Sequence, residues 1–285
     1  MVCLGASMWG GSGVAGQYLL QDCGFSTGWL VVSRMLLAGV IFLAADVMQY
    51  KESILRVWRD KKDAGDLVLF AILGLLAVQY TYFACIKYGN AAAATVLQYL
   101  MPIIIVGYTA LTTRKLPQYR EIICVVMAIG GTFLLVTHGN WHELSIPLNA
   151  LLWGLASAVA AAVYTMKPKR LIRKWRPTLV IGWGMLAGGI FLLPFCPPWQ
   201  FTGEWNILSG VIYAYVIVFG TVAAFGFYLG SIKYIQPAEA SILGSVEPLA
   251  AIILSIIFLQ ASFGVMDILG TFLIIGTVFL LAKNK

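Results

Sequence analysis

Long apolar runs separated by short polar connections dominate the chain from end to end. The runs are about 20 residues long, which is the length that an α-helix needs to cross a bilayer. They lack the alternation of apolar and polar residues that barrel strands show, so they predict helices. We therefore expect an all-α membrane protein with ten transmembrane helices. The expected helices are Cys3–Leu20, Trp29–Val47, Leu67–Ile86, Ala91–Leu111, Ile122–Val136, Pro147–Met166, Thr178–Pro194, Leu208–Ile232, Ala238–Leu259 and Val265–Ala282.

Two stretches of the chain share one pattern. Tyr82–Pro102 (YFACIKYGNAAAATVLQYLMP) aligns without a gap with Tyr228–Pro248 (YLGSIKYIQPAEASILGSVEP). The same register continues into the following helix, where Gly130 aligns with Gly276. Self-similarity at a long period indicates a structural repeat. The match between the first two and the sixth and seventh helices is weak. We predict two five-helix units, residues 1–137 and 147–285, and because five is odd, the second unit is inverted in the membrane.

Positive charge alternates between successive connections. Five connections, counting the C-terminal end, carry Lys or Arg, whereas the opposite five are nearly free of cations, with Lys87 as the exception. By the positive-inside rule, the cation-rich connections and both termini are cytoplasmic. The cations are Lys51, Arg56, Arg59, Lys61 and Lys62; Arg114, Lys115 and Arg120; Lys167, Lys169, Arg170, Arg173, Lys174 and Arg176; Lys233; Lys283 and Lys285.

Composition narrows the class of protein further. The 285 residues are 60% hydrophobic and 11% charged, against about 25% charged in a soluble domain. The net charge of +7 follows from the cation-rich connections, so we expect a multi-pass protein of the cytoplasmic membrane and no nucleic-acid partner. Five scattered cysteines without a CxxC pair predict no metal site. No Walker A sequence is present, so neither ATP as direct driver nor a cofactor is expected. The oligomeric state does not follow from the sequence.

Three further features point to a known family. Trp9-Gly10 lies in the first apolar run, Arg34 lies in the second within SRMLLAG, and a proline-centred motif, AEASILGSVEPLAAIILSIIFLQ, spans Ala238–Gln260. Together with the ten expected helices and the inverted units, these features resemble the EamA family of the drug/metabolite transporter superfamily. The resemblance covers essentially the whole chain.

The sequence also departs from that family. The proline-centred helices of the family usually end in a Gly-Glu pair, whereas this chain has Thr113-Arg114 and Leu259-Gln260. Any role of that carboxylate is therefore not carried over. The resemblance implies a secondary carrier or exporter of small organic solutes, such as amino acids or related metabolites, and it alone favours export over uptake.

Glu247 is the sharpest candidate for the chemistry. We expect it about ten residues into the ninth helix, roughly 15 Å from the cytoplasmic end. A carboxylate there costs about 2.5–3.5 kcal/mol on insertion scales, so it should be paired, protonated or facing water. Pro248 frees a backbone carbonyl one turn earlier, which can line a cavity. One interpretation is that Glu247 holds a cationic part of the substrate or exchanges a proton. The other is that it is a structural partner of Arg34.

Arg34 lies about six residues below the outer end of the second helix, roughly 9 Å deep. Its depth differs from that of Glu247 by only about 6 Å in a ~30 Å core, which long side chains can span. A substrate carboxylate is an alternative partner, because the planar guanidinium suits that group. We favour a structural or gating role for Arg34, and also for Pro102 and Pro248.

Polar and aromatic side chains at mid-depth complete the expected site. Amides and hydroxyls in hydrocarbon need partners, and a water-filled pocket supplies them. Interhelical hydrogen bonding and ordinary packing are the alternative explanation for each single residue. The resemblance places the first helix in the wall of the site as well. With Glu247, the expected substrate-binding residues are Trp9, Gln79, Tyr82, Gln98, Tyr99, Tyr164, Phe225, Tyr228 and Ser245.

These observations predict a secondary active transporter that works by alternating access. Its expected partners are a small organic solute, the lipid bilayer and, as a candidate coupling ion, the proton. A passive facilitator or an uptake carrier of the same fold is the first alternative. An intramembrane enzyme is remote, because the apolar segments offer one convincing carboxylate and no histidine. We therefore expect no enzymatic activity.

Overall fold

The computed structural model describes residues 1–114, 118–140, 145–231, 234 and 243–282, and within these ranges the chain is helical without strands. Six of the described helices are long and apolar enough to cross a membrane, and shorter apolar helices accompany them. The protein is therefore a multi-pass membrane protein. The helices are α1 (Val2–Gln17), α2 (Thr27–Tyr50), α3 (Lys61–Leu69), α4 (Ala77–Tyr88), α5 (Ala91–Gln98), α6 (Met101–Thr113), α7 (Tyr119–Thr137), α8 (Leu148–Met166), α9 (Lys169–Lys174), α10 (Pro177–Leu192), α11 (Ile207–Ile217), α12 (Ala224–Ser231), α14 (Val246–Leu259) and α15 (Val265–Ala282).

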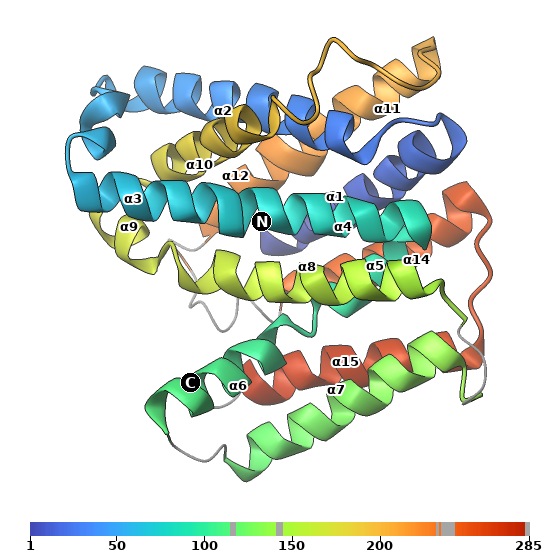
Figure 1. Ribbon diagram of the computed structural model, residues 1–285. Coiled ribbons are helices and arrows are strands. Elements are labelled where there is room, and N and C mark those ends of the chain that lie inside the picture. The colour runs from blue at the N-terminus through green and yellow to red at the C-terminus, as the bar shows by residue number, and fades with distance from the viewer. Residues whose placement is uncertain (115–117, 141–144, 232–233, 235–242, 283–285) are drawn as a thin grey trace.

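Two helix pairs flank a central group (Figure 1). Helices α2 and α10 pack along each other on one side of the molecule, and α7 packs along α15 on the opposite side. Between them, α1 contacts α4, α5, α12 and α14, and α8 contacts α4 and α5. Helix α1 thus lies at the centre of the bundle.

Glycines allow α1 to occupy this crowded position. A Cβ built on Gly10 would lie 2.6 Å from the carbonyl oxygen of Glu247 and 2.9 Å from the backbone nitrogen of Ala251. Small residues let helix backbones approach closely in a membrane, where the hydrophobic effect does not drive helices together. The Trp9-Gly10 pair therefore has a packing reason: Gly10 brings α1 against the backbone of α14.

Two of the expected segments, Ala91–Leu111 and Ala238–Leu259, are each interrupted by a turn just before a proline, although Ala91–Thr113 still forms one span long enough to cross a membrane. Helix α5 ends at Gln98 and α6 begins at Met101, and α14 begins at Val246. The part of the ninth segment at residues 238–242 lies outside the described residues. The physical reason is proline, which has no N–H to donate to the carbonyl four residues earlier. Glu247 consequently lies in the first turn of α14, and not ten residues into a continuous helix.

The third and eighth expected helices contain wider, π-helical turns. Phe70–Leu76 separates α3 from α4, and Val218–Ala223 separates α11 from α12. Such turns leave backbone groups outside the regular hydrogen-bond ladder and occur often at functional sites. The turn at Val218–Ala223 includes Gly220, whose carbonyl accepts a hydrogen bond from a side chain of α2.

The third helix also begins earlier than the expected Leu67. Helix α3 starts at Lys61, because the Asp60 side chain caps it by accepting hydrogen bonds from the backbone nitrogens of Lys62 (2.9 Å) and Asp63 (3.3 Å). Hydropathy cannot place this start, since the first turn is polar. A side-chain cap of this kind satisfies backbone donors that the helix itself leaves unpaired.

Ion pairs join two of the cation-rich connections. Arg176 donates to both carboxylate oxygens of the buried Asp46, at 2.7 and 3.1 Å, and to Glu52 at 2.7 Å. Lys174 lies 2.6 Å from Asp63 and 3.1 Å from Asp60. The connections around residues 51–60 and 167–176 therefore meet at one end of the bundle, as expected if they share one side of the membrane.

Candidate functional site

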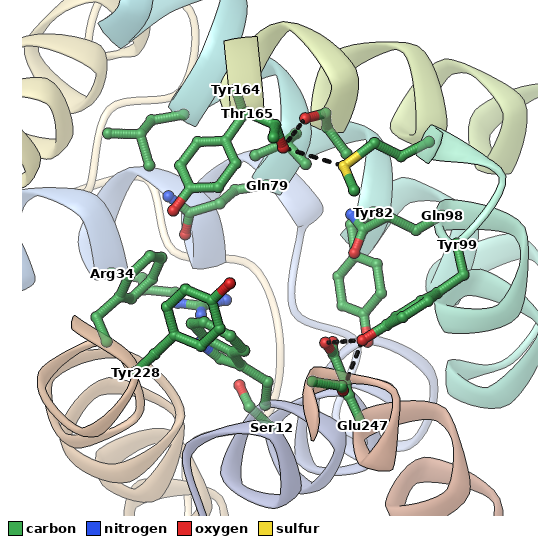
Figure 2. A pocket seen from close by; sticks show the side chains of 17 residues that line it. Ser12, Arg34, Gln79, Tyr82, Gln98, Tyr99, Tyr164, Thr165, Tyr228 and Glu247 are labelled. Atoms are coloured by element: carbon green, nitrogen blue, oxygen red, sulfur yellow. Dashed lines mark hydrogen bonds between the residues drawn. The ribbon is translucent and has the colours of Figure 1, made fainter. Parts of the chain in front are cut away.

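A cavity of about 220 Å³ lies among the central helices (Figure 2). Nine of the ten residues that the sequence predicts to bind substrate line it, and so does Arg34. Ser245 is buried but is not among the lining residues, and neither are Pro102 and Pro248. The nine are Trp9 of α1, Gln79 and Tyr82 of α4, Gln98 of α5, Tyr99 between α5 and α6, Tyr164 of α8, Phe225 and Tyr228 of α12, and Glu247 of α14.

Glu247 contacts Tyr99, which lies in the turn between α5 and α6. The hydroxyl of Tyr99 donates to the carbonyl oxygen of Gly244 at 2.7 Å and lies 3.3 Å from a carboxylate oxygen of Glu247. Gly244 is four residues before Pro248, so its carbonyl is the one that the proline leaves without an N–H partner. The sequence expectation that this carbonyl borders a cavity is met, since Gly244 lines the pocket.

Arg34 is held by the π-helical turn at Val218–Ala223. Its Nε donates to the hydroxyl of Thr221 at 2.6 Å, and its Nη2 donates to the carbonyl of Gly220 at 3.1 Å. The guanidinium carbon also lies 5.1 Å from the ring centre of Phe83, a favourable cation–π placement. These contacts tie α2 to the segment between α11 and α12.

Glu247 and Arg34 do not form an ion pair in the part of the chain that the structure describes. Among the described residues, the ion pairs include neither side chain. The reason is directional: the donors of Arg34 face Gly220 and Thr221, whereas Glu247 faces Tyr99 on the other side of the cavity (Figure 2). The two charges thus both border the cavity without neutralising each other.

Two buried polar side chains at the cavity have no partner among the described residues. Neither amide atom of Gln79 makes a hydrogen bond with these residues, although Gln79 is only 8% exposed. The hydroxyl of Ser12, a residue 2% exposed, is also unpaired. A buried unsatisfied polar group costs about 1–3 kcal/mol. Unpaired groups in a cavity are therefore those that a ligand or water would satisfy.

Aromatic rings form much of the remaining wall. Trp9 packs edge-on against Phe225 with ring centres 5.0 Å apart, and its ring centre lies 5.2 Å from that of Tyr228. The Tyr82 hydroxyl is paired with Thr95 at 2.8 Å, and the Gln98 amide donates to Ser157 at 2.8 Å. The wall therefore combines apolar faces with polar groups that are already positioned by neighbouring helices.

Seven lining residues were not predicted from the sequence: Ser12, Leu75, Val78, Met101, Ala161, Thr165 and Gly244. Two of them carried a usable signal. Ser12 is three residues after Trp9, so both lie on one face of α1. Met101 aligns with Glu247 in the repeat, and its sulfur lies 3.1 Å from the Thr165 hydroxyl. The apolar members carry no sequence signal that separates a cavity wall from packing.

The described residues contain no group of three or more His, Cys, Asp or Glu side chains that could hold a metal ion. The polar groups of the cavity are instead one carboxylate, one guanidinium, amides and hydroxyls. Such a set can hold and orient a small organic molecule by hydrogen bonds and charge.

Comparisons with known proteins identify the family and the fold of the chain. The model of the EamA-like transporter family matches residues 1–137 and again residues 148–283. "Uncharacterized inner membrane transporter YicL" of Salmonella typhimurium is 41% identical over 287 residues, covering 100% of this chain and 94% of the relative. "Protein PecM" of Dickeya dadantii is 24% identical over 286 residues, covering 92% of each chain. A solved crystal structure shares the fold, with a TM-score of 0.67 at 18% identity over 99% of this chain and 96% of the other. The chain belongs to the EamA-like transporter family.

Proposed function

We propose that this protein is a secondary active transporter that carries a small organic solute across the cytoplasmic membrane by alternating access, with the cavity around Glu247 as the solute site. The observation that carries the proposal is a cavity lined by aromatic and polar side chains, in which the amide of Gln79 has no hydrogen-bond partner and Glu247 has no cationic partner among the described residues. Export is the direction that the family resemblance favours.

We also propose that the chain forms two inverted units of five helices each, with both termini cytoplasmic. The helix breaks support this arrangement, because Tyr99 and Ser245 align in the repeat and have nearly equal backbone angles, φ −70° and ψ 2° against φ −67° and ψ 0°. The π-helical turns at Phe70–Leu76 and Val218–Ala223 also fall at corresponding places in the repeat.

Contacts between α7 and α15 support the same symmetry. A Cβ on Gly131 would lie 2.7 Å from the Gly270 carbonyl oxygen, and the Cys124 thiol lies 3.8 Å from the Thr277 carbonyl oxygen. In the register of the repeat, Gly131 corresponds to Thr277 and Cys124 corresponds to Gly270. Each contact is therefore the image of the other, which is the signature of a two-fold relation. Two units of one packing, used in both orientations, favour inward-open and outward-open states of similar energy.

Proton exchange at Glu247 is part of the proposal. A carboxylate inside a membrane protein is costly when charged and unpaired, and no cation pairs with Glu247 among the described residues. Binding of a proton and binding of a cationic group both relieve that cost. If the two compete for one carboxylate, the movement of one is coupled to the movement of the other.

Counterflow in proteoliposomes at several pH values, with the wild type and Glu247→Gln, tests this proposal. The wild type should exchange solute at a rate that varies with pH, and the variant should lose that dependence, because an amide does not titrate. Wild-type exchange with unchanged pH dependence in the variant would remove Glu247 from the coupling role.

A passive facilitator or an uptake carrier with the same fold is the alternative within the same class. Concentrative flux that an uncoupler abolishes separates an active transporter from a facilitator, and the direction of that flux in oriented vesicles separates export from uptake. The family and the names of the relatives point away from an enzyme.

A further inference from the structure

The polar groups of the cavity gather at two separated ends. Figure 2 shows Glu247, Tyr99 and Gln98 on one side of the cavity, and Arg34 and Gln79 on the opposite side. All five residues line the same cavity. One end therefore carries the carboxylate and the other end the guanidinium.

At the first end, the carboxylate of Glu247 lacks a strong donor. Its hydrogen-bond partner among the described residues is the Tyr99 hydroxyl, 3.3 Å away. That hydroxyl has a single proton, and it lies closer to the Gly244 carbonyl, at 2.7 Å. This end is thus complementary to a group with several N–H donors and a positive charge, which describes an ammonium.

At the opposite end, Arg34 and Gln79 offer N–H donors that suit a hydrogen-bond acceptor. The guanidinium of Arg34 has hydroxyl and carbonyl partners but no acidic partner among the described residues. The NH2 group of the Gln79 amide has no hydrogen-bond acceptor among the described residues, and the residue is only 8% exposed. A carboxylate accepts from both kinds of donor, and its planar form matches the guanidinium.

Part of the remaining wall of the same cavity is aromatic. Phe225 and Tyr228 both pack against Trp9, with ring centres 5.0 and 5.2 Å from it. Apolar and aromatic surfaces of this kind bury the body of a ligand while a few polar groups fix its orientation.

From this arrangement we propose that the substrate is a zwitterion whose ammonium and carboxylate lie at opposite ends of an apolar body. The inference rests on the proposed function of the cavity as the solute site, and it adds the chemical class. An α-amino acid carries both charges on one carbon, so it satisfies one end of the cavity and leaves the other unpaired. An ω-amino carboxylate, or an aromatic ring with the two groups opposite each other, satisfies both.

Pairs of constitutional isomers test this directly on the full-length protein in lipid nanodiscs. Norleucine and 6-aminohexanoate have the same formula and the same charges, as do phenylglycine and 4-(aminomethyl)benzoate. They differ in the separation of the charges. We expect the separated isomer of each pair to have a Kd at least tenfold lower, equivalent to about 1.4 kcal/mol, measured by ligand-induced thermal stabilisation.

Two variants then assign the ends. Glu247→Gln should weaken 6-aminohexanoate and hexylamine alike by about tenfold or more, because both use the ammonium. Gln79→Leu should weaken 6-aminohexanoate but leave hexylamine unchanged, since hexylamine has no carboxylate. Gln79→Leu removes an unsatisfied buried amide, so it should fold with an unfolding temperature no lower than that of the wild type. The isomer comparison on the wild type needs neither variant.

Equal or tighter binding of the α-isomers would overturn the inference, as would the absence of binding by all four zwitterions. The proposed function is tested separately. If norleucine binds at least as tightly as 6-aminohexanoate and Glu247→Gln weakens it, the solute site stands and the charge separation fails. If neither variant changes the binding of any ligand, the site itself is wrong.

Discussion

The two helix breaks, one before Pro102 and one before Pro248, have the same backbone and different side chains. The residue three positions before each proline has φ near −70° and ψ near zero: −70° and 2° at Tyr99, and −67° and 0° at Ser245. In the first break the position before proline is Met101, whose sulfur lies 3.1 Å from the Thr165 hydroxyl. In the second break it is Glu247, which lies 3.3 Å from the Tyr99 hydroxyl.

This difference shows how a repeated scaffold can hold an asymmetric site. The first break contributes a donor, the Tyr99 hydroxyl, and the second contributes acceptors, the Gly244 carbonyl and the Glu247 carboxylate. Backbone geometry follows from proline, which is present twice, whereas chemistry follows from side chains that are not repeated. Of the four predictions below, three alter one break or its surroundings relative to the other, and the fourth alters a region away from both.

The largest effect is expected from Glu247→Met, which gives the second break the residue of the first. We expect solute exchange to fall by roughly 10- to 150-fold, corresponding to the loss of a charged hydrogen bond of about 1.5–3 kcal/mol. The unfolding temperature should stay the same or rise, because a carboxylate without a cationic partner leaves the interior. Counterflow and thermal unfolding measure the two effects. Met101→Leu is the matched control and should exchange normally; an active Glu247→Met would show that the asymmetry has no role in transport.

Gly10→Val should disturb the second break through the backbone. The added Cβ would lie 2.6 Å from the Glu247 carbonyl oxygen, so α1 must shift, at a cost of about 1–3 kcal/mol for overpacking. Thermal or denaturant unfolding in mild detergent measures the loss. The control is Gly107→Ala on α6, after the first break, where nothing lies within 4 Å of the added Cβ. That change should stabilise by about 0.5–1 kcal/mol, and a Gly10→Val protein as stable as the wild type would contradict the close approach.

Tyr99→Phe removes the contact between the two breaks. The Gly244 carbonyl loses the donor at 2.7 Å, and we expect a loss of about 0.5–1.5 kcal/mol in the free energy of unfolding. The Tyr164 hydroxyl makes no hydrogen bond within the part of the chain that the structure describes, so Tyr164→Phe should change the stability less. Denaturant titrations of the two variants compare them, and equal stabilities would argue that the Tyr99–Gly244 contact is not formed.

The smallest effect belongs to the charged end of the bundle. A hydrogen bond from Arg176, together with its positive charge, holds the pKa of Glu52 below its usual value of 4.5. Because the folded pKa is depressed, the pair contributes stability at pH above 4.5 and loses it as the pH falls through the folded pKa. Glu52→Gln should therefore flatten the acid side of a series of unfolding temperatures against pH. Ligand binding at the cavity should be unaffected, and a change there would contradict the separation of the two regions.

The residues themselves account for most of the helices and for nine of the residues that line the cavity, with Arg34 as a tenth. Apolar runs predict membrane helices because the free energy of transfer into hydrocarbon is the sum of the contributions of the residues in the run. Polar residues within those runs, such as Gln79 and Glu247, predict a site because each needs a partner. The position of Pro248 predicted a backbone carbonyl without a helical N–H partner, which the structure identifies as that of Gly244. These are local properties, so they can be obtained from sequence.

Other features depend on distance between segments far apart in the chain. The sequence left Arg34 and Glu247 as candidate partners, and the structure separates them, because the π-helical turn at Val218–Ala223 offers Arg34 a carbonyl and a hydroxyl. Hydropathy could not show that two helices break, since proline at the start of a helix and proline inside one have similar local sequences.

The amino-acid sequence by itself determined the membrane helices, the repeat and the presence of one carboxylate beside a proline in an apolar segment. Tertiary structure alone decided which groups pair. It left both amide atoms of Gln79 without a partner among the described residues, and it placed Glu247 and Arg34 at opposite ends of one cavity. The physical reason is that burial is set largely by local hydrophobicity, whereas hydrogen bonds and ion pairs require atoms within a few ångströms, and only the packed helices bring distant residues that close.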